Sequence, residues 1–565
     1  RQKKAQVPQA SLQDLSETFG SVVHDLARPA TLQAPLGPTQ QCGFSAFQPV
    51  AVSAVESCLS SVDPSKATGS DGVPGLLLHK FSSILAPNLT KIINYSLRTG
   101  QLPSTFKSSH VTPLFKGGDP TSPTNYRPVS LLPIISRILE AFVKKQLTTY
   151  LESAQLLPTS QFAYRKQHST EDALALAVNR WSLAKSRREY TGVVFVDMSK
   201  AFDRVQHERL LTELFSLGIS GTPLTWFADY LSGRFQQIRV QGHLSPAVSC
   251  SRGVPQGSVL GPLLFVLYTS TLSTILPPAV NHQEFADDIT LDCSDTDPTE
   301  VCRTLSHAIT SLATWLEDIG LLLNAAKTQL LFIKPRGADD TQPEVFCHAD
   351  KLAITPSAKY LGVILDEELS WKPHIAHLSR KTARTIGQLW RHGQGLSLRA
   401  RRTWFLSMVL SQLCYGSNSF VPGLSAQLLG RLEKSFKAGI RATLQQRFLT
   451  PTAPLLALLS IVSLAHTYTQ KVLIFVHRCI NGYCSPLLQQ LFTTTAPNTV
   501  LNDQRITRGQ VSNLLQVPFL RGPAGRSSMM FHGSIAWNAL SADVRSITAA
   551  DQFKRALSDI DVLNL

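Results

Sequence analysis

The spacing of apolar residues changes along this chain, and each change predicts a different kind of element. Apolar residues recur at the spacing of one helix face over 131–143 and again over 301–316, which is typical of helices that pack on one side. Short apolar runs rich in β-branched residues predict strands between helices. These runs lie at 193–196, 238–242, 289–291, 330–333 and 360–365. The fold class is therefore predicted to be α+β.

The two ends of the chain follow other patterns. Residues 1–40 are rich in Pro, Gln, Ser and Ala with little periodicity, which is typical of a linker. A helical region is predicted from about 49 to 104, interrupted by a loop at 69–75. Beyond Trp371 the pattern becomes helical and basic. At about 150 residues per domain, the chain should form roughly three or four structural units.

Two adjacent acids interrupt one of the apolar segments. Asp287 and Asp288 follow Phe285-Ala286 and precede an apolar strand-like run. Buried charges cost several kcal/mol each unless they are paired or bind a metal. A third acid, Asp197, ends the apolar run 193–196. The sequence therefore predicts two aspartates at a hairpin tip and a third at the end of a neighbouring strand.

Three carboxylates in this arrangement suit a site for two Mg²⁺ ions. Mg²⁺ takes oxygen ligands and is usually held by one or two carboxylates together with substrate phosphates. Two such ions, about 3.5–4 Å apart, can activate a 3′-hydroxyl and stabilise a leaving pyrophosphate. A lone Asp-Asp pair is more often a turn or helix-cap feature, but the third acid favours a nucleic-acid polymerase.

The net charge agrees with a polyanionic partner. The chain has 565 residues, a formal charge of +15 and 43% apolar residues, so it can form packed cores and is not a disordered protein. Segment 371–447 contains thirteen Lys and Arg residues and a single acid, Glu433, so it alone carries +12. A solvated helix face is the alternative explanation for such a segment. The concentration of charge favours a surface that faces nucleic acid.

Cysteine usage and hydropathy indicate an intracellular protein. Nine cysteines are scattered without a CxxC pair, which favours reduced thiols over a disulfide framework. The longest apolar runs are shorter than the ~20 residues that span a bilayer, so no membrane contact is expected. No signal peptide is visible, and the first residue is Arg1. We therefore expect a piece of a longer translation product.

Three blocks stand in the order of reverse-transcriptase motifs: 194–203 (VFVDMSKAFD), 253–258 (GVPQGS) and 285–288 (FADD). They resemble the motifs of non-LTR (LINE-type) retrotransposons. Further similar blocks are 67–72, 125–132, 255–268 and 360–363. The resemblance runs from about 50 to 420, and 536–538 with 553–554 resemble the tail of the chicken-repeat and Jockey-like branches.

The resemblance implies roles for individual residues. Asp197, Asp287 and Asp288 match the catalytic metal ligands, and the backbone carbonyl of Met198 matches a further ligand. The implied cofactor is two Mg²⁺ ions, with Mn²⁺ as a possible substitute. Phe202 falls at the steric gate that excludes the ribose 2′-hydroxyl, although an ordinary core aromatic is the alternative.

Other matches concern the nucleotide and the leaving group. Gln256 and Gly257 match positions near the incoming dNTP, where glycine permits close backbone approach. Lys116 and Arg127 resemble residues that clamp the triphosphate. Lys327 matches a general acid for pyrophosphate, with a plain surface lysine as the alternative.

Three expectations of a different kind accompany these roles. Asp203 is expected to cap a helix or form an ion pair rather than hold metal. The segment 360–362 resembles the primer-grip hairpin. Trp371, Trp390 and Trp404 are expected to pack rather than to stack on bases.

The resemblance also implies a domain plan. The expected fold is a right-hand polymerase, with fingers and palm built on an antiparallel palm sheet, then a helical thumb and a small C-terminal domain. The expected bounds are 1–40 for the linker, 41–106 for an N-terminal helical extension, 107–366 for fingers and palm, 367–447 for the basic thumb and 448–565 for the C-terminal domain. Two departures are Phe285 in place of the usual Tyr, and 459–468, which lacks an expected Trp-Leu-Pro…Arg block.

The implied activity is that of an RNA-directed DNA polymerase. Its partners would be an RNA template, a DNA primer or target, and dNTPs, in target-primed reverse transcription of a retrotransposon. An endonuclease would lie upstream in the full product. The implied location is the nucleus during integration and the cytoplasm as a ribonucleoprotein. The alternatives are a catalytically inactive or domesticated RNA-binding remnant, and a polymerase such as an intron maturase or telomerase subunit.

Overall fold

The computed structural model describes residues 8–24, 43–338, 343–494, 513–520 and 522–562. The chain divides into two compact units, each built from several segments. Unit 1 comprises 1–158, 198–276 and 311–324, and unit 2 comprises 159–197, 277–310 and 325–565. Each unit has its own β-sheet, so the class of mixed helices and strands is confirmed.

The sheet of unit 2 has the strand order β12-β9-β3-β8-β7. Its pairings are antiparallel except between β12 and β9. The strands are β3 (Tyr190–Val196), β7 (Asn281–Phe285), β8 (Asp288–Asp295), β9 (Gln329–Ile333) and β12 (Ala353–Ile354). The β-branched runs at 193–196, 289–291 and 330–333 are strands, as predicted, because their side chains are buried on the pleated surface.

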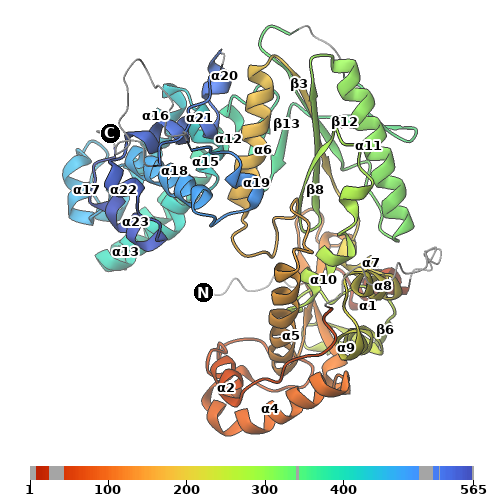
Figure 1. Cartoon of the computed structure of the whole chain (residues 1–565). Helices are drawn as coiled ribbons and strands as arrows, with labels where there is room; N and C mark the ends of the chain where they lie inside the picture. Colours follow the sequence, from red (N-terminus) through yellow and green to blue (C-terminus); the bar gives the residue numbers. More distant parts are fainter. Residues whose placement is uncertain (1–7, 25–42, 339–342, 495–512, 521, 563–565) are drawn as a thin grey trace. The chain divides into compact units, whose positions relative to one another are not determined.

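Helix α6 (Thr170–Ser186) contacts this sheet and leads into β3 (Figure 1). Its Trp181 is fully buried in one core cluster with Val193 of β3 and Leu331 of β9. The β13–β14 hairpin (Ser357–Tyr360 and Val363–Asp366) belongs to the same cluster. The predicted single strand 360–365 is therefore wrong: a turn interrupts it at Leu361, whose φ of 43° is left-handed.

Residues 371–447 are helical, as the sequence predicts. The helices are α12 (Lys372–His392), α13 (Leu398–Trp404), α14 (Ser411–Cys414), α15 (Ser417–Phe420) and α16 (Ala426–Leu444), with a π-helical turn at Phe405–Leu410. Leu389 of α12, Phe405 and Phe436 of α16 are buried in the cluster that contains Trp181. This basic region therefore packs on apolar side chains that point away from its charged face.

The C-terminal part of unit 2 forms a second core. The helices of this part are α17 (Ala453–Leu459), α18 (Leu464–Ile480), α19 (Pro486–Gln489), α20 (Gly522–Arg526), α21 (Met529–Ala539), α22 (Ala542–Arg545) and α23 (Ala550–Ser558). Of these, α17 packs in the cluster that contains Trp181. Trp537 and Phe553 pack at 5.6 Å between ring centroids in this core. Arg478 of α18 pairs with the buried Asp172 of α6 at 3.1 Å, which joins the two helices.

Among the described residues, no single helix is long and apolar enough to cross a membrane. One bent pair, α17 with α18, passes that test of length and composition, with a bend of 55°. The eight cysteines of the described residues are all free.

Unit 1 also has a five-stranded sheet, in the order β2-β1-β4-β5, with β6 also paired to β4. The strands are β1 (Ser108–Phe115), β2 (Tyr126–Leu131), β4 (Arg234–Val240), β5 (His243–Leu244) and β6 (Val248–Cys250). The β1–β2 pairing is antiparallel and the β1–β4 pairing is parallel. The strand predicted at 238–242 is the end of β4, but β4 stops at Val240 because Gln241 and Gly242 form a left-handed turn.

A helix lies within the predicted N-terminal linker. Helix α1 (Leu12–His24) buries Leu15 and Phe19 in a cluster with Val111 of β1 and Ile238 of β4. The prediction of a loosely ordered lead-in is therefore wrong for these residues. Their helical apolar spacing is short and surrounded by Gln, Ser and Pro. The part of that prediction that concerns residues 25–40 lies outside the described residues.

Helices form most of the remainder of unit 1. They are α2 (Val52–Ser60), α3 (Gly75–Lys80), α4 (Ser82–Thr99), α5 (Ile134–Ser153), α7 (Ala201–Arg204), α8 (His207–Ser216), α9 (Gly221–Leu231) and α10 (Gly261–Tyr268). The helical region predicted for 49–104 is confirmed. Helix α11 (Pro298–Asp318) begins at Pro298 and ends just before Gly320, as its sequence predicts.

Candidate active site

The register of the unit 2 sheet brings the predicted aspartates to one end of it. Val196, the last residue of β3, pairs with Ile289 of β8. Asp197 follows Val196 directly, and Asp288 precedes Ile289, so the two acids extend neighbouring strands at the same edge. Asp287 lies in the turn that joins β7 to β8. The predicted placement, two acids at a hairpin tip and one at a strand end, is confirmed.

The hairpin tip has only two loop residues, Ala286 and Asp287, between the paired Phe285 and Asp288. Ala286 has a φ of 60°, which is the positive first-loop angle that two-residue hairpins use. Its N–H donates to Oε1 of the buried Gln161 at 3.1 Å. The tip is therefore fixed by a hydrogen bond to a neighbouring segment as well as by its ladder.

The aspartates at the tip are exposed rather than buried. Asp287 and Asp288 are exposed and Asp197 is half-buried, whereas Ile289 is buried. The expectation of buried charges in an apolar segment is wrong, because the turn places both acids beyond the last buried ladder residue. Because the two acids are exposed, the cost of burying charge does not require a metal ion here. The argument for a metal site is that the three acids lie at the same edge of the sheet.

The donor set at this edge suits a hard divalent cation, because all three side chains are carboxylates. In the described part of the chain, however, no group of three or more His, Cys, Asp or Glu side chains is arranged so that it could already hold a metal ion. Mg²⁺ sites commonly draw part of their ligands from substrate phosphates and water. The carboxylates fit such an open site and not a closed protein cage.

Lys327 lies beside the same strand end. It occupies the turn before β9, and its neighbour Thr328 is fully buried. The Thr328 hydroxyl accepts a hydrogen bond from the Asp197 N–H at 3.4 Å. The Lys327 side chain is exposed. The backbone of the predicted general acid thus lies close to a predicted metal ligand, in the same unit.

Further residues near the aspartates were not predicted from sequence. Tyr164 is 47% exposed, and partial burial together with the charge of Asp287 raises the pKa of its hydroxyl. Glu284 of β7 is buried and accepts a hydrogen bond from Ser160 at 2.9 Å. Burial raises the pKa of Glu284 to about 7. The only sequence signal for Glu284 is that an acidic residue stands within a strand. No sequence signal indicates Tyr164.

The remaining predicted residues lie in unit 1. Phe115 pairs with Tyr126 and Leu114 with Arg127, at the turn end of the β1–β2 hairpin. Lys116 extends the ladder by donating its N–H to the Asn125 carbonyl at 2.8 Å. Since alternate residues of a strand share a face, Lys116 and Arg127 lie on the same face. Both side chains are exposed.

The amide of Gln256 is already engaged within the protein. Its Nε2 donates to Oδ1 of Asp203 at 2.8 Å, and its carbonyl accepts from the Ser130 N–H at 2.7 Å. Burial raises the pKa of Asp203 to about 6, while the Gln256 hydrogen bond and the charges of Lys200 and Lys116 oppose that shift. The expected cap or ion pair for Asp203 is wrong: its hydrogen-bond partner is a neutral amide.

Gly257 is needed for packing of the backbone. Its φ is 120°, and an added Cβ would lie 2.6 Å from the Ser130 carbonyl oxygen of β2. An L-residue cannot adopt that angle without strain. The sequence predicts a glycine here because a nucleotide approaches the backbone closely. In the structure, the close approach of strand β2 already requires a glycine at this position.

Phe202 and Met198 complete the set of predicted residues. Phe202 is half-buried and stacks on Phe265 of α10, with ring centroids 4.6 Å apart and an interplanar angle of 27°. One ring face is therefore a packing surface, as the core-aromatic alternative requires. The Met198 side chain is buried, and its backbone forms an isolated antiparallel bridge with Leu323.

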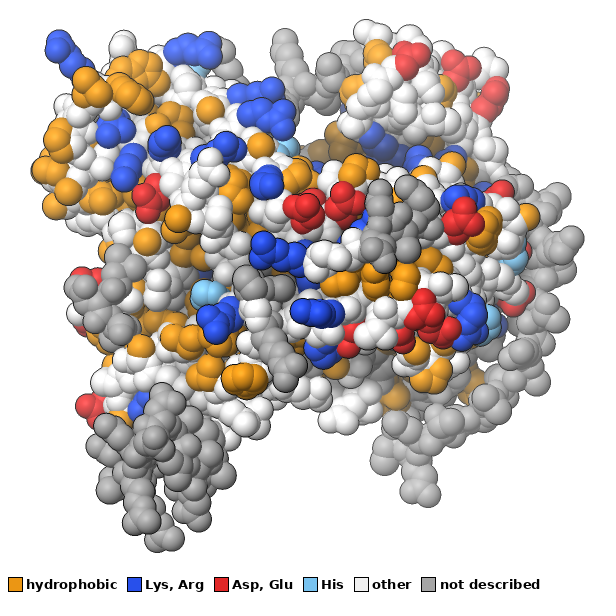
Figure 2. Space-filling model, turned by 90° about the horizontal axis from the view of Figure 1, so that it is seen from above, with side chains coloured by type: hydrophobic (Ala, Val, Ile, Leu, Met, Phe, Trp, Pro, Cys, Tyr) orange, Lys and Arg blue, Asp and Glu red, His pale blue; other side chains and the backbone are white. Residues whose placement is uncertain are grey.

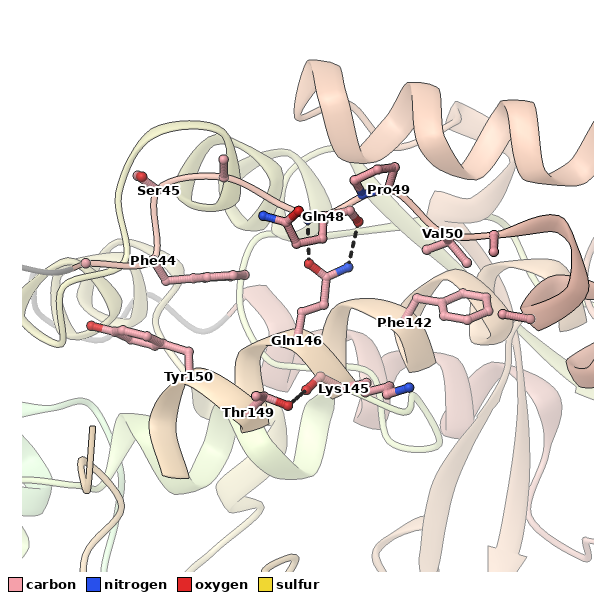
Figure 3. Close-up of a pocket in the computed structure, with 14 residues that line it drawn as sticks. Phe44, Ser45, Gln48, Pro49, Val50, Phe142, Lys145, Gln146, Thr149 and Tyr150 are labelled. Atoms are coloured by element: carbon pink, nitrogen blue, oxygen red, sulfur yellow. Dashed lines mark hydrogen bonds between the residues drawn. The ribbon is translucent and has the colours of Figure 1, made fainter. Parts of the chain in front are cut away.

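Two cavities of unit 1 contribute little to this chemistry. The cavity lined by Asp203, Gln256 and Arg252 measures about 40 Å³, which suits a water molecule rather than a nucleotide. The larger one, about 640 Å³, lies between 43–54 and α5 and contains none of the predicted residues. Figure 3 shows its wall, where Gln48 and Gln146 exchange two hydrogen bonds, of 2.7 and 2.9 Å.

The basic segment 371–447 exposes most of its charge. Ten of its thirteen basic side chains are exposed, and the other three, Arg401, Arg402 and Arg441, are half-buried. Packing is confirmed for Trp371, which is 2% exposed, and for Trp404, which lies against the core. It is wrong for Trp390, which is 42% exposed near the end of α12. Figure 2 shows Lys and Arg side chains interspersed with other types over the face seen from above.

Comparison with known proteins agrees with this arrangement. Residues 115–365 match the family described as reverse transcriptase (RNA-dependent DNA polymerase). The chain is 28% identical over 416 residues, 71% of its length, to a probable RNA-directed DNA polymerase from transposon BS of Drosophila melanogaster. It is 30% identical over 367 residues, 64% of its length, to the RNA-directed DNA polymerase from mobile element jockey of Drosophila funebris.

A third relative is the Pol polyprotein from the type-1 retrotransposable element R2 of Popillia japonica, 26% identical over 423 residues and 72% of this chain. The aligned parts cover 44%, 39% and 56% of the three relatives. The matched segment contains both strand ends that carry the aspartates, and it defines a reverse transcriptase domain. The chain therefore contains a reverse transcriptase domain that is similar to those of LINE-type, non-LTR retrotransposon RNA-directed DNA polymerases.

Proposed function

We propose that the chain extends a DNA 3′-end on an RNA template at the edge formed by Asp197, Asp287 and Asp288. The observation that carries this proposal is the β3–β8 register, which places the end of one strand beside the start of the other. The match to RNA-directed DNA polymerases supports the reaction class. The division into fingers, palm and basic thumb is part of the same proposal.

The three carboxylates would hold two divalent ions, Mg²⁺ or Mn²⁺, together with the Met198 carbonyl. Such ions supply activation of the 3′-hydroxyl and neutralisation of charge on the leaving pyrophosphate. The exposure of Asp287 and Asp288 leaves room for phosphate oxygens as further ligands. Little covalent chemistry then falls to the protein, whose work is to position the substrates.

Cationic side chains would orient the triphosphate and donate a proton. Arg127 suits bidentate phosphate binding, and Lys116 adds a positive charge on the same strand face. Lys327 would protonate the leaving pyrophosphate, because its backbone lies next to Asp197 and its amine is exposed. Phe202 would limit space beside the sugar, with its ring held by Phe265.

Gln256 would act differently from the other predicted residues. Asp203 orients its amide through one of the two Nε2 hydrogens, so the side chain would meet the nucleotide in a fixed orientation. The basic helices of 371–447 would bind template and primer through phosphates, largely without sequence selection. In the full-length product, an upstream endonuclease would supply the primer at a nicked target. The reaction would take place in the nucleus, and the RNA complex would assemble in the cytoplasm.

Primer extension tests the proposal directly. The chain is incubated with an RNA template, a DNA primer, dNTPs and Mg²⁺, beside Asp287→Ala and a control, Asp350→Asn, at an exposed position of the β10–β11 hairpin (Phe346–Cys347 and Asp350–Lys351). We expect product from the unmodified chain and from the control only. If the unmodified chain gives no more product than Asp287→Ala, the catalytic proposal fails and the alternative of an inactive RNA-binding remnant is favoured.

A further inference from the structure

A large cavity of unit 2 lies at the end of its sheet opposite to the aspartates. It measures about 1450 Å³. Thr191 at the start of β3 pairs with Ile333 at the end of β9, and the residues that flank this pair, 185–188 and 334–338, line the cavity. Six residues of extended strand separate this end from Asp197, roughly 20 Å.

Four chain segments build the cavity. They are the end of α6 with the connection to β3 (182 and 185–188), the loop after β9 (334–338), the connection from β14 to α12 (367–371) and residues 519, 520, 522 and 527, with Gly423 beside them. Small-molecule sites are usually 300–1,000 Å³. The volume thus favours part of a polymer over a compact metabolite.

The lining offers cations for phosphates. Five basic side chains line the cavity, namely Lys185, Arg187, Arg188, Lys334 and Arg336. Arg187 is paired with Glu189 at 2.7 Å, and Nζ of Lys185 donates to the Glu368 carbonyl at 2.5 Å. Within the described residues, Arg188 and Arg336 are exposed and have no ion-pair partner. These two guanidinium groups are therefore available to a ligand.

An aromatic ring stands in the same lining. Phe519 is 93% exposed and lies beside Leu520. A fully exposed phenyl ring beside cationic side chains is the combination that binds single-stranded nucleic acid, where bases stack on rings and phosphates meet Lys and Arg. Glu367 and Glu368 line the cavity too. They would repel a compact polyanion, but an extended strand can keep its phosphates near the arginines.

We propose that this cavity binds single-stranded nucleic acid, at a site separate from the aspartate edge of the same unit. The inference rests on the proposed polymerase function, since it assigns a second contact for a strand that the enzyme handles. Arg188 and Arg336 would contact phosphates, and Phe519 would stack on a base. The shared chemistry of the ligand is an unpaired phosphodiester strand, which RNA template and displaced DNA both offer.

Binding of labelled 30-nucleotide RNA and DNA of one sequence, followed by fluorescence anisotropy across salt concentrations, tests the site. The double variant R188E/R336E is compared with K66E/R555E, which changes the net charge equally at two exposed positions outside the cavity. We expect the double variant to bind at least about ten-fold more weakly than the control. The slope of the logarithm of the binding constant against the logarithm of the salt concentration should be shallower by about 1.4 for the double variant. This value is about 0.7 for each of the two lost phosphate contacts.

The ring is tested by Phe519→Ala, with Tyr95→Ala as the matched control because Tyr95 is 55% exposed on α4. Loss of one stacked base should weaken binding about five-fold or more. Weaker binding of RNA alone assigns the site to template, and of DNA alone to the displaced strand. Binding of R188E/R336E and of Phe519→Ala within two-fold of their controls, for both strands, would overturn the proposal.

Crosslinking separates this site from the basic helices. RNA carrying 4-thiouridine is irradiated with the full chain, and the crosslinked peptides are identified by mass spectrometry. We expect crosslinks in 513–527 or 334–338, and their complete absence would contradict the proposal. Primer extension is measured on the same variants. If the unmodified chain gives no extension product, only the polymerase proposal is refuted. Strand binding at the cavity is measured separately, by anisotropy and crosslinking.

Discussion

The tip of the β7–β8 hairpin and the turn at Gln256–Gly257 both consist of short motifs, but the structure explains them differently. At the tip, Asp287 and Asp288 are exposed, so the packing of a buried core does not fix their identity. At the turn, Gly257 is required by the Ser130 carbonyl, and Gln256 is held by Asp203. Residues that packing does not require are the better candidates for chemistry.

The largest expected effect is at the aspartate edge. Asp197→Asn keeps the shape of the side chain and its backbone hydrogen bond to Thr328 but removes a charged oxygen ligand. Primer extension should fall on the order of 1,000-fold, because charge stabilisation by bound ions supplies several kcal/mol. The thermal unfolding midpoint should stay near that of the unmodified chain. Extension within ten-fold of the unmodified chain would remove Asp197 from the proposed site.

At the Gln256–Gly257 turn the effect should be on stability. Gly257→Ala forces an L-residue to a φ of 120° and a Cβ within 2.6 Å of a carbonyl oxygen. We expect the free energy of unfolding to fall by about 3 kcal/mol. Gly430→Ala is the control, since this glycine lies within α16 with open space around it. That control should be neutral or slightly stabilising, and equal thermal midpoints for the two variants would contradict the packing role.

Lys327 tests whether the aspartate edge extends to a proton donor. Lys327→Gln should lower the single-turnover rate about 100-fold, because general-acid catalysis typically contributes that much. The KM for dNTP should change little. Lys359→Gln, at another exposed lysine in unit 2, is the control. A rate within two-fold of this control would show that Lys327 is a plain surface residue.

The smallest effect concerns Asp203 and has a defined pH dependence. The pKa of Asp203 is raised to about 6 in the folded chain, whereas an unfolded Asp titrates near 3.9. Between these values the folded state binds more protons, so this group lowers stability as pH rises from about 4 to 6. Asp203→Asn keeps an acceptor for Gln256. The full difference between these pKa values corresponds to about 3 kcal/mol, but Asp203 is only half-buried and solvent screens it, so we expect a gain in stability of about 1 kcal/mol at pH 8. At pH 4 the gain should be close to zero, as measured from thermal midpoints.

Strand register explains how much of the site could be predicted. Asp197 and Asp288 follow and precede apolar runs that pair with each other, so their common edge was predictable from 193–196 and 289–291 alone. The exposure of the acids was not, because it depends on a two-residue turn at Ala286. The partners of Gln256 and Gly257 were also hidden, since they come from β2 and α7, far away in sequence.

Among the larger elements, helix and strand types followed from periodicity, and the errors lie where local signals are short. Helix α1 has thirteen residues within a polar, Pro-rich segment and is stabilised by burying Leu15 and Phe19 against the unit 1 sheet. The turn at Leu361 interrupts an apolar run that reads as one strand. Both outcomes are set by tertiary packing, which periodicity alone does not describe.

Localised cleavage by bound iron tests whether the ends of β3 and β8 hold a metal ion. Fe²⁺ replaces Mg²⁺ on the chain in the presence of primer, RNA template and dNTP, and added hydrogen peroxide oxidises the bound Fe²⁺ to Fe³⁺ with release of hydroxide and a hydroxyl radical that cuts the nearby backbone, while ascorbate reduces the iron again. We expect cuts close to 197 and 286–288, suppressed by excess Mg²⁺ and lost in Asp197→Asn and Asp287→Asn but not in Asp350→Asn. Cuts elsewhere only, or cuts that persist in both aspartate variants, would contradict a metal site at the ends of β3 and β8.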